Sequence, residues 1–240
     1  MKQAQQIKIT VLIDNNPGPK PLITRWGLSL FVEVNNIAFL FDTGPDPEAL
    51  EYNANALGIN LDKVEFIIIS HMHFDHFGGL SYFINKKPDV TIYFPEDHYI
   101  VSQIGAKGPR VIVTSNAINK ISENMYIVKF KHFITEQCVI INTAVGLIML
   151  VGCSHPKIEQ MSAYIYEHFK QRVYAIIGGF HLGSDITRLK RIIETFRRIG
   201  VQEVYPLHCS GDIAREFFEI HLKQVYKDGH VGTKIVIPCE

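Results

Sequence analysis

The sequence predicts a mixed fold of strands and helices, of the α/β or α+β class. The early part of the chain alternates as β-strands do, for example over residues 7–13. The later part changes to helix and strand in turn, with an amphipathic helix expected over residues 185–199. Between them an apolar run over residues 66–69 leads into a histidine-rich loop closed by Gly78-Gly79, which is typical of a buried strand ending at a sheet edge. No repeat, linker or low-complexity segment interrupts residues 1–240, so we expect a single domain.

The individual elements follow from apolar periodicity and from the turn residues that bound them. Asn35-Asn36 indicates a two-residue hairpin turn, while Pro47 and Gly58 suit the start and the end of a helix. In chain order the expected strands cover residues 7–13, 28–34, 37–41, 66–69, 90–94, 111–113, 125–130, 138–142, 147–151, 173–177 and 204–207, and the expected helices begin at Pro47, Gly78, Pro95, Pro156 and Asp185.

Composition and charge argue against several classes of function. The 24 Lys and Arg residues balance the 24 Asp and Glu residues, and without a basic stripe we expect no nucleic-acid partner. The polar N-terminal segment has no apolar signal core and no apolar stretch reaches transmembrane length, so we expect a cytoplasmic protein without membrane contact. The four cysteines lack zinc-ribbon or disulfide spacing and are expected to be free thiols. The sequence indicates no oligomeric state.

The loop after the apolar run carries four candidate metal ligands, His71, His73, Asp75 and His76. Imidazole and carboxylate together suit zinc, and also manganese or iron. Adjacent backbone positions cannot all aim at one tetrahedral centre, so the economical arrangement places His71 and His73 on one centre and Asp75 and His76 on another. A merely polar loop is disfavoured, because each uncompensated buried His or Asp costs free energy. The sequence therefore predicts a site for two divalent metal ions, zinc before manganese or iron.

The remaining metal ligands are expected at the ends of other strands. Three later histidines each follow an expected strand. His155 and His208 are expected to be metal ligands. His181 is open between a ligand and an acid or base that faces the substrate. The remaining histidines lack this context and are expected at the surface or in packing contacts.

These residues carry a family resemblance. The pattern His71-x-His73-x-Asp75-His76 looks like the signature of the metallo-β-lactamase superfamily. Asp42 in Phe41-Asp42-Thr43-Gly44 resembles its first motif, and His208 resembles its last ligand. Four further motifs resemble one subgroup, which is similar to the methanopterin-biosynthesis dihydropteroate-synthase-like proteins: Trp26-Gly27-Leu28-Ser29, Gly152-Cys153-Ser154-His155, Gly178-Gly179-Phe180-His181 and His208-Cys209-Ser210-Gly211.

The resemblance implies an αββα four-layer sandwich with a dinuclear site between its two sheets. Asp42 is expected to hold a liganding imidazole in its tautomer, with capping of a turn as the alternative. The superfamily usually offers a metal-bridging aspartate within Gly-Asp, where this chain has Gly152-Cys153. Cys153 is either a thiolate ligand or, as we favour, a small buried residue beside the metals. This departure weakens the expectation that both metals bind tightly and that hydrolysis follows.

The resemblance also implies roles in catalysis. In a site of this kind two metals share and activate a water molecule, which Asp75 would orient and deprotonate. His181 would protonate a leaving group. Arg25 and Trp26 lie in a loop where the superfamily has an active-site flap, and they are expected to contact the substrate.

Three functions of different classes follow. The first is a metal-dependent hydrolase of a small ester or phosphate compound. The second, from the subgroup resemblance alone, is a metal-dependent synthase that condenses a dihydropterin pyrophosphate with a ribofuranosyl-aminobenzene phosphate. The third is a non-catalytic metal- or ligand-binding protein. An antibiotic-hydrolysing lactamase is disfavoured without a secretion signal, a nuclease by the neutral charge, and the diiron branch by His73 where that branch usually has Glu.

Overall fold

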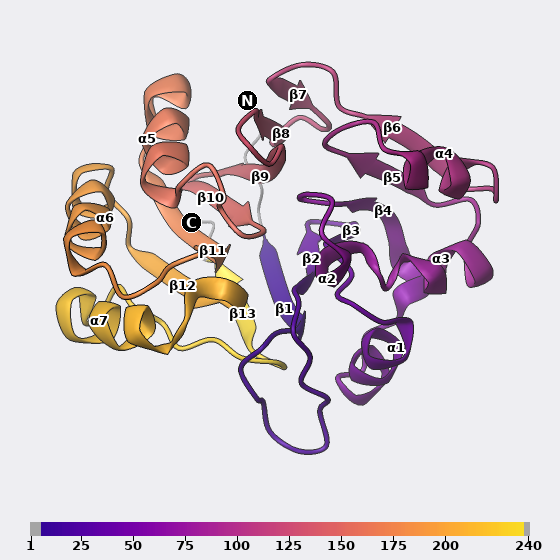
Figure 1. The fold of residues 1–240 in the computed structure, drawn as a ribbon, viewed down its shortest axis with the longest axis horizontal. Helices are drawn as coiled ribbons and strands as arrows, with labels where there is room; N and C mark the ends of the chain where they lie inside the picture. The colour runs from indigo at the N-terminus through magenta and orange to yellow at the C-terminus, as the bar shows by residue number, and fades with distance from the viewer. Residues whose placement is uncertain (1–5, 238–240) are drawn as a thin grey trace.

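The computed structural model describes residues 6–237 of the 240-residue chain. The start of the polar N-terminal segment, residues 1–5, and Cys239, one of the expected free thiols, lie outside the described residues. Two β-sheets pack face to face, and helices cover the outer face of each (Figure 1). The predicted mixture of strands and helices is therefore confirmed, and it is arranged in four layers.

The first sheet has seven strands in the order β13-β1-β2-β3-β4-β5-β6. Its first members pair antiparallel, and β3 to β6 run parallel to one another. The strand bounds are β1 (Ile7–Ile13), β2 (Ser29–Val34), β3 (Ile37–Phe41), β4 (Val64–Ile68), β5 (Thr91–Phe94), β6 (Arg110–Val113) and β13 (Lys234–Ile237).

The second sheet has six strands in the order β12-β11-β10-β9-β8-β7. The pairs β7–β8, β8–β9 and β9–β10 are antiparallel, whereas β10, β11 and β12 run parallel to one another. The bounds are β7 (Ile118–Lys120), β8 (Met125–Phe130), β9 (Glu136–Thr143), β10 (Gly146–Val151), β11 (Val173–Gly179) and β12 (Glu203–Leu207).

Three apolar clusters hold the layers together. One contains side chains of both sheets, such as Phe39 and Ile148, and fills the space between them. The other two lie under the helices, with α5, α6 and α7 over the second sheet and α1, α3 and α4 over the first (Figure 1). The helix bounds are α1 (Pro47–Ala56), α2 (Phe74–Phe77), α3 (Leu80–Lys86), α4 (Tyr99–Gly105), α5 (Ile158–Phe169), α6 (Ile186–Arg198) and α7 (Asp212–Leu222), with short 3-10 turns η1 (Leu61–Lys63) and η2 (His208–Ser210).

The parallel strands decide where the polar loops meet. Carboxyl ends of parallel strands lie at the same edge of a sheet, which is where open α/β sheets bind ligands. In the first sheet β3 and β4 lead into Asp42 and the histidine loop. In the second sheet β10, β11 and β12 lead into His155, His181 and His208.

Several elements differ from the sequence expectation. The helix expected from Gly78 is α3, which begins two residues later at Leu80, whereas the short helix α2 within the histidine loop was not predicted. The helix expected at Pro95 begins at Tyr99, since the His98 ring accepts from the Ile100 N–H and caps it. The elements β7, β13 and α7 were not predicted. Within the part of the chain that the structure describes, no helix has the length and apolarity needed to cross a membrane.

Candidate metal centre

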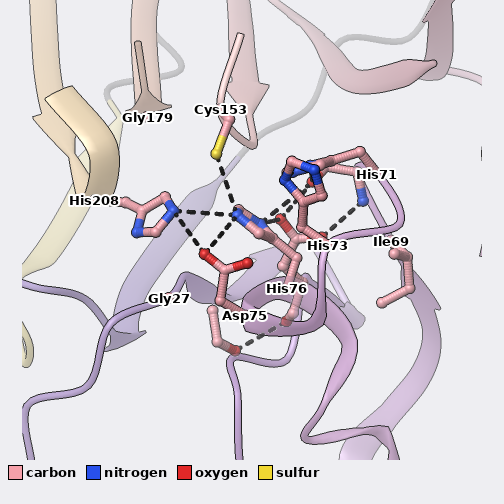
Figure 2. A network of polar contacts seen from close by, with 12 residues as sticks. Gly27, Ile69, His71, His73, Asp75, His76, Cys153, Gly179 and His208 are labelled. Carbon is pink, nitrogen blue, oxygen red and sulfur yellow. Dashed lines mark hydrogen bonds and ion pairs between the residues drawn. The ribbon is translucent and has the colours of Figure 1, made fainter. Parts of the chain in front are cut away.

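The histidine loop sits between the two sheets, directly after β4. Figure 2 shows His71, His73, Asp75 and His76 around one region, which Cys153 and His208 enter from the second sheet. A backbone hydrogen bond from the residue just before β2 helps to fix the loop, because the Leu28 N–H donates to the Asp75 carbonyl over 3.3 Å. Gly27 must be glycine there, since a Cβ would lie 2.4 Å from that carbonyl oxygen.

A first group of donors consists of His71, His73 and His155. Nε2 of His71 lies 2.9 Å from Nδ1 of His73. The His155 ring centroid lies 4.7 Å from that of His71 and 5.0 Å from that of His73. The structure thus brings together the two histidines predicted for one centre and adds His155 to them.

A second group consists of Asp75, His76 and His208. The Nε2 atoms of His76 and His208 face each other at 3.2 Å, although the two residues are 132 positions apart. Oδ2 of Asp75 lies 3.3 Å from His208 Nε2 and 3.7 Å from His76 Nε2 (Figure 2). Burial raises the pKa of Asp75, but the adjacent His208 and His76 imidazoles, in their protonated forms, outweigh burial and lower the value to about 2. Asp75 is therefore an anion at the centre.

Cys153 lies between the two groups. Its Sγ is 3.3 Å from His76 Nε2. The geometry also allows Cys153 to share a metal ion with His71 and His155, or with His76 and His208. This is the place between two metals at which the resemblance implies an aspartate.

Hydrogen bonds fix which nitrogen of His76 and of His71 carries the proton. Oδ2 of Asp42 lies 2.6 Å from His76 Nδ1 and accepts the Ser70 hydroxyl proton over 2.7 Å. A carboxylate only accepts, so Nδ1 of His76 must carry its hydrogen. The Ser70 oxygen, having given its proton to Asp42, accepts in turn from His71 Nδ1 over 2.9 Å. In both rings the lone pair is therefore on Nε2.

The same reasoning applies to His155 and His208. Oε2 of Glu136, a fully buried carboxylate, lies 2.9 Å from Nδ1 of His155. The side-chain oxygen of Asn15 lies 2.9 Å from Nδ1 of His208, while the amide group of Asn15 donates to the His208 carbonyl. Since Nδ1 donates in both rings, His155 and His208, like His71 and His76, hold an unprotonated Nε2.

Lone pairs that face each other at close range require a cation between them. Burial and the neighbouring imidazoles lower the pKa of His71, so its ring stays neutral. Burial lowers the pKa of His76, but Asp42 and Asp75 outweigh it and raise the pKa overall. The negative field that would draw a proton to His76 Nε2 equally attracts a metal ion. The donor set of imidazole nitrogens, one carboxylate and one sulfur fits a divalent metal such as zinc.

Backbone strain is concentrated at these strand ends. Positive φ angles occur at Asp42 (60°), Ser154 (60°), His181 (43°) and His208 (47°), none of which is glycine. Such a conformation costs an L-residue about 1–2 kcal/mol. Strain of this kind persists where the surrounding contacts over-determine it, as at functional sites.

The residues expected to face the substrate lie at the mouth of the site. Trp26 is 67% exposed, and its ring lies edge-on to that of His208 at 5.5 Å between centroids. The Arg25 guanidinium is instead paired with Asp46 through a 2.9 Å contact. His181 is exposed, with its ring 4.8 Å from that of His155, and a bond with Cys209 raises its pKa.

Four residues around the site were not singled out from the sequence. Glu136 accepts from the backbone N–H groups of Cys153, Ser154 and His155 as well as from the His155 ring. Asp14 and Asn15, which directly follow β1, hold the backbone and the ring of His208. Cys209 lies beside Cys153 and His181. The available signal was a charged residue, Glu136, two positions before the strand expected over residues 138–142, and in the structure it is the first residue of β9.

Comparison with known proteins agrees with this geometry. The family model described as the metallo-beta-lactamase superfamily matches residues 27–122, which include Asp42 and the whole histidine loop. Among solved structures, Tm1679, "a metal-dependent hydrolase of the beta-lactamase superfamily", superposes with a TM-score of 0.83 at 26% identity, covering 97% of this chain and 99% of that one. The chain is a metallo-β-lactamase-fold protein, and the predicted αββα sandwich is confirmed.

Within this class the chain is similar over nearly its full length to one curated enzyme. That enzyme is the 7,8-dihydropterin-6-methyl-4-(β-D-ribofuranosyl)-aminobenzene-5'-phosphate synthase of Methanocaldococcus jannaschii, 27% identical over 97% of both chains. A ribonuclease Z of Listeria innocua is 33% identical over 102 residues, but this match covers only 39% of the present chain and 32% of the relative. The subgroup resemblance stated from the motifs is therefore confirmed.

Changing Asp42 to Asn is expected to weaken metal binding without unfolding the protein. Asparagine keeps one oxygen for the Ser70 N–H but presents an N–H group to His76 Nδ1. His76 would then carry its proton on Nε2, where the metal must bind. Changes of this kind cost about 10- to 100-fold in metal affinity. Competition with a fluorescent zinc chelator measures it, with the exposed Asp89→Asn as the control; equal affinity in the two variants would contradict the assignment.

Proposed function

We propose that the protein is a metal-dependent synthase that joins a dihydropterin diphosphate to the amino group of a ribofuranosyl-aminobenzene phosphate. The single observation that supports this reaction over hydrolysis is the 27% identity to the M. jannaschii synthase over 97% of both chains. The cluster of unprotonated Nε2 atoms supports metal dependence, with His71, His73 and His155 as one set of ligands and Asp75, His76 and His208 as the other.

The site also has features that suit an aromatic, phosphorylated substrate. The exposed Trp26 offers a flat apolar surface next to His208, where an aromatic ring can stack. His181, whose pKa is raised, supplies a proton or positive charge at the mouth of the site for a phosphate group. Trp26 adjoins His208 of the second group and His181 adjoins His155 of the first, which supports one end for the ring of a substrate and another for its charge.

In the proposed reaction the amine nitrogen forms a bond to the methylene carbon of the pterin while the bond from that carbon to the diphosphate breaks. Bound divalent metal supplies positive charge that stabilises the departing diphosphate. Asp42, Glu136 and Asn15 hold the histidine rings in the tautomers described above. Asp75, with a pKa of about 2, is a weak base, which favours a ligand role over that of proton acceptor. His181 donates its proton to the diphosphate, and the amine proton leaves to solvent.

Hydrolysis of a small phosphate compound or ester is the second candidate. The similarity to Tm1679 favours it, since that structure is described as a metal-dependent hydrolase. The sulfur of Cys153 at the central position argues the other way. A thiolate gives more electron density to a metal than a carboxylate does, so it makes bound water less acidic.

One assay separates the candidates. Protein loaded with zinc, manganese or iron is incubated with the dihydropterin diphosphate, with and without the ribofuranosyl-aminobenzene phosphate, and products are followed by chromatography. We expect the coupled pterin and free diphosphate only when both substrates are present. Release of diphosphate without the amine would make the protein a hydrolase, and no turnover with any metal would overturn both candidates. The matched inactive control is His71→Ala.

Changing Trp26 to Ala is expected to raise KM for the aromatic substrate and leave metal content unchanged. Aromatic stacking contributes about 1–3 kcal/mol, which corresponds to roughly a 5- to 150-fold change. Trp26→Phe keeps a ring and should recover most of the loss. If KM were equal in the wild type and Trp26→Ala, the stacking role would be wrong.

A further inference from the structure

A third cluster of metal-binding side chains lies beside the two groups described above. It consists of Cys153, Cys209 and His181, whose donor atoms all lie within 4.8 Å of one another. Each follows a different parallel strand, β10 for Cys153, β12 for Cys209 and β11 for His181. The proposed reaction uses neither sulfur.

The backbone around Cys209 is shaped to hold its sulfur in place. The His181 N–H donates to Cys209 Sγ over 3.3 Å, and the Cys209 thiol donates to the Cys153 carbonyl over 3.8 Å. At Gly179 a Cβ would lie 2.7 Å from Cys209 Sγ, so a larger residue there would displace the sulfur. His181 itself takes a left-handed φ of 43°, which costs free energy and must be compensated by these contacts.

The donor set has a distinct chemical preference. Two sulfurs and one imidazole form a soft set, which prefers zinc, cadmium or other thiophilic ions to magnesium or manganese. In a tetrahedral zinc site, ligand atoms lie about 3.5–3.8 Å apart, as follows from Zn–S and Zn–N bonds of about 2.3 and 2.0 Å. The three donor atoms are already within 4.8 Å of one another. A small inward movement therefore completes three of four positions, and the fourth stays open on the side of the exposed His181.

We propose that Cys153, Cys209 and His181 form a third cation site, for a thiophilic divalent ion, at the mouth of the dinuclear centre. Among the described residues, three sets of side chains could each share an ion: Cys153 with His71 and His155, Cys153 with His76 and His208, and Cys153 with His181 and Cys209. Cys153 is the residue that all three sets have in common. Figure 2 shows its sulfur directed at His76, between the His208 and His71 sides. An ion bound first by the exposed His181 and by Cys209 can pass to the buried histidines while it keeps Cys153 as a ligand, which leaves the His181 ring free to carry the proton that the proposed reaction needs. This proposal takes up the thiolate alternative for Cys153 in place of the small buried residue that we favoured from the sequence.

Cadmium titration of the metal-free, reduced protein tests the site without any substrate, so its outcome is separate from that of the proposed reaction. The readouts are the ultraviolet absorption of the cadmium–thiolate bond and the number of ions bound. Wild type should show absorption from two sulfurs. Cys209→Ser should lose about half of that absorption and one equivalent of cadmium, because one of two sulfur ligands is gone. The controls are Cys138→Ala and His168→Ala, since neither residue belongs to a donor cluster among the described residues.

Equal absorption and stoichiometry in the wild type and Cys209→Ser would overturn the proposal, as would a wild type without thiolate absorption. Should Cys209→Ser fail to fold, cadmium NMR of the wild type provides a second test. A resonance in the sulfur-ligated range that shifts in His181→Ala supports the site. Only resonances of nitrogen- and oxygen-ligated cadmium would refute it.

Discussion

Replacing Glu136 with Gln is expected to lower both metal affinity and stability. The buried carboxylate of Glu136 accepts four hydrogen bonds, from the backbone N–H groups of Cys153, Ser154 and His155 and from the His155 ring. Burial raises the pKa of Glu136, but the hydrogen bonds from the His155 ring and from the backbone N–H groups of Ser154 and His155 outweigh it and lower the pKa, so the group is an anion. Glutamine puts an amide donor where two of these donors point. Each buried N–H left without an acceptor costs about 1–3 kcal/mol.

The expected result is a lower thermal midpoint and the loss of the first group's metal ion, because His155 and Cys153 lose their common support. Thermal unfolding and metal analysis measure the two effects. Glu123→Gln makes the same chemical change at an exposed position and should do neither. A Glu136→Gln protein with unchanged midpoint and metal content would show that the carboxylate does not position the site.

His208→Ala is expected to remove about one equivalent of metal and most activity, because the second group then keeps only Asp75 and His76. The path of the chain should survive the change. The backbone N–H of His208, which alanine retains, donates to Asp14 over 2.7 Å. The variant therefore reports the lost imidazole rather than a displaced loop.

The matched control for this experiment is His168→Ala. His168 lies on α5 and belongs to none of the donor clusters found among the described residues. Metal content is measured after dialysis against a weak chelator, so that loosely held ions are removed. A His208→Ala protein that kept the wild-type metal content and affinity would exclude His208 as a ligand.

Local patterns were sufficient to predict much of the fold. The hairpin at Asn35-Asn36, the helix from Pro47 and the amphipathic helix ending near Ile199 each depend on residues close in sequence. The unpredicted strand β13 pairs with β1, more than two hundred residues away, and gains its stability from that pairing. Its four residues, Lys234–Ile237, are rich in β-branched side chains, but so short a run does not by itself specify a strand.

The residues of the candidate site also fall into those that local sequence patterns indicate and those that only long-range packing reveals. The candidate ligands His71, His73, Asp75 and His76 could be proposed from the sequence because they crowd one loop, and His155, His181 and His208 because each follows an apolar strand. Glu136 and Asn15 could not be assigned, since their roles depend on partners that only the packing of the two sheets brings near. Asn15 reaches His208 across 193 positions of sequence. Cys209 was part of a matched motif, yet only the fold places it beside Cys153.

The central claim, that the histidine loop binds metal ions, is tested most directly by zinc analysis of reconstituted and dialysed protein. Wild type should retain at least two equivalents, as expected of a dinuclear site. His71→Ala should retain at least one fewer, because the first group then loses the His71 Nε2 donor, which lies 2.9 Å from His73 Nδ1. Asp89→Asn, an exposed change, should match the wild type. Wild-type protein that retains no zinc, or His71→Ala protein that retains as much as the wild type, would contradict the account.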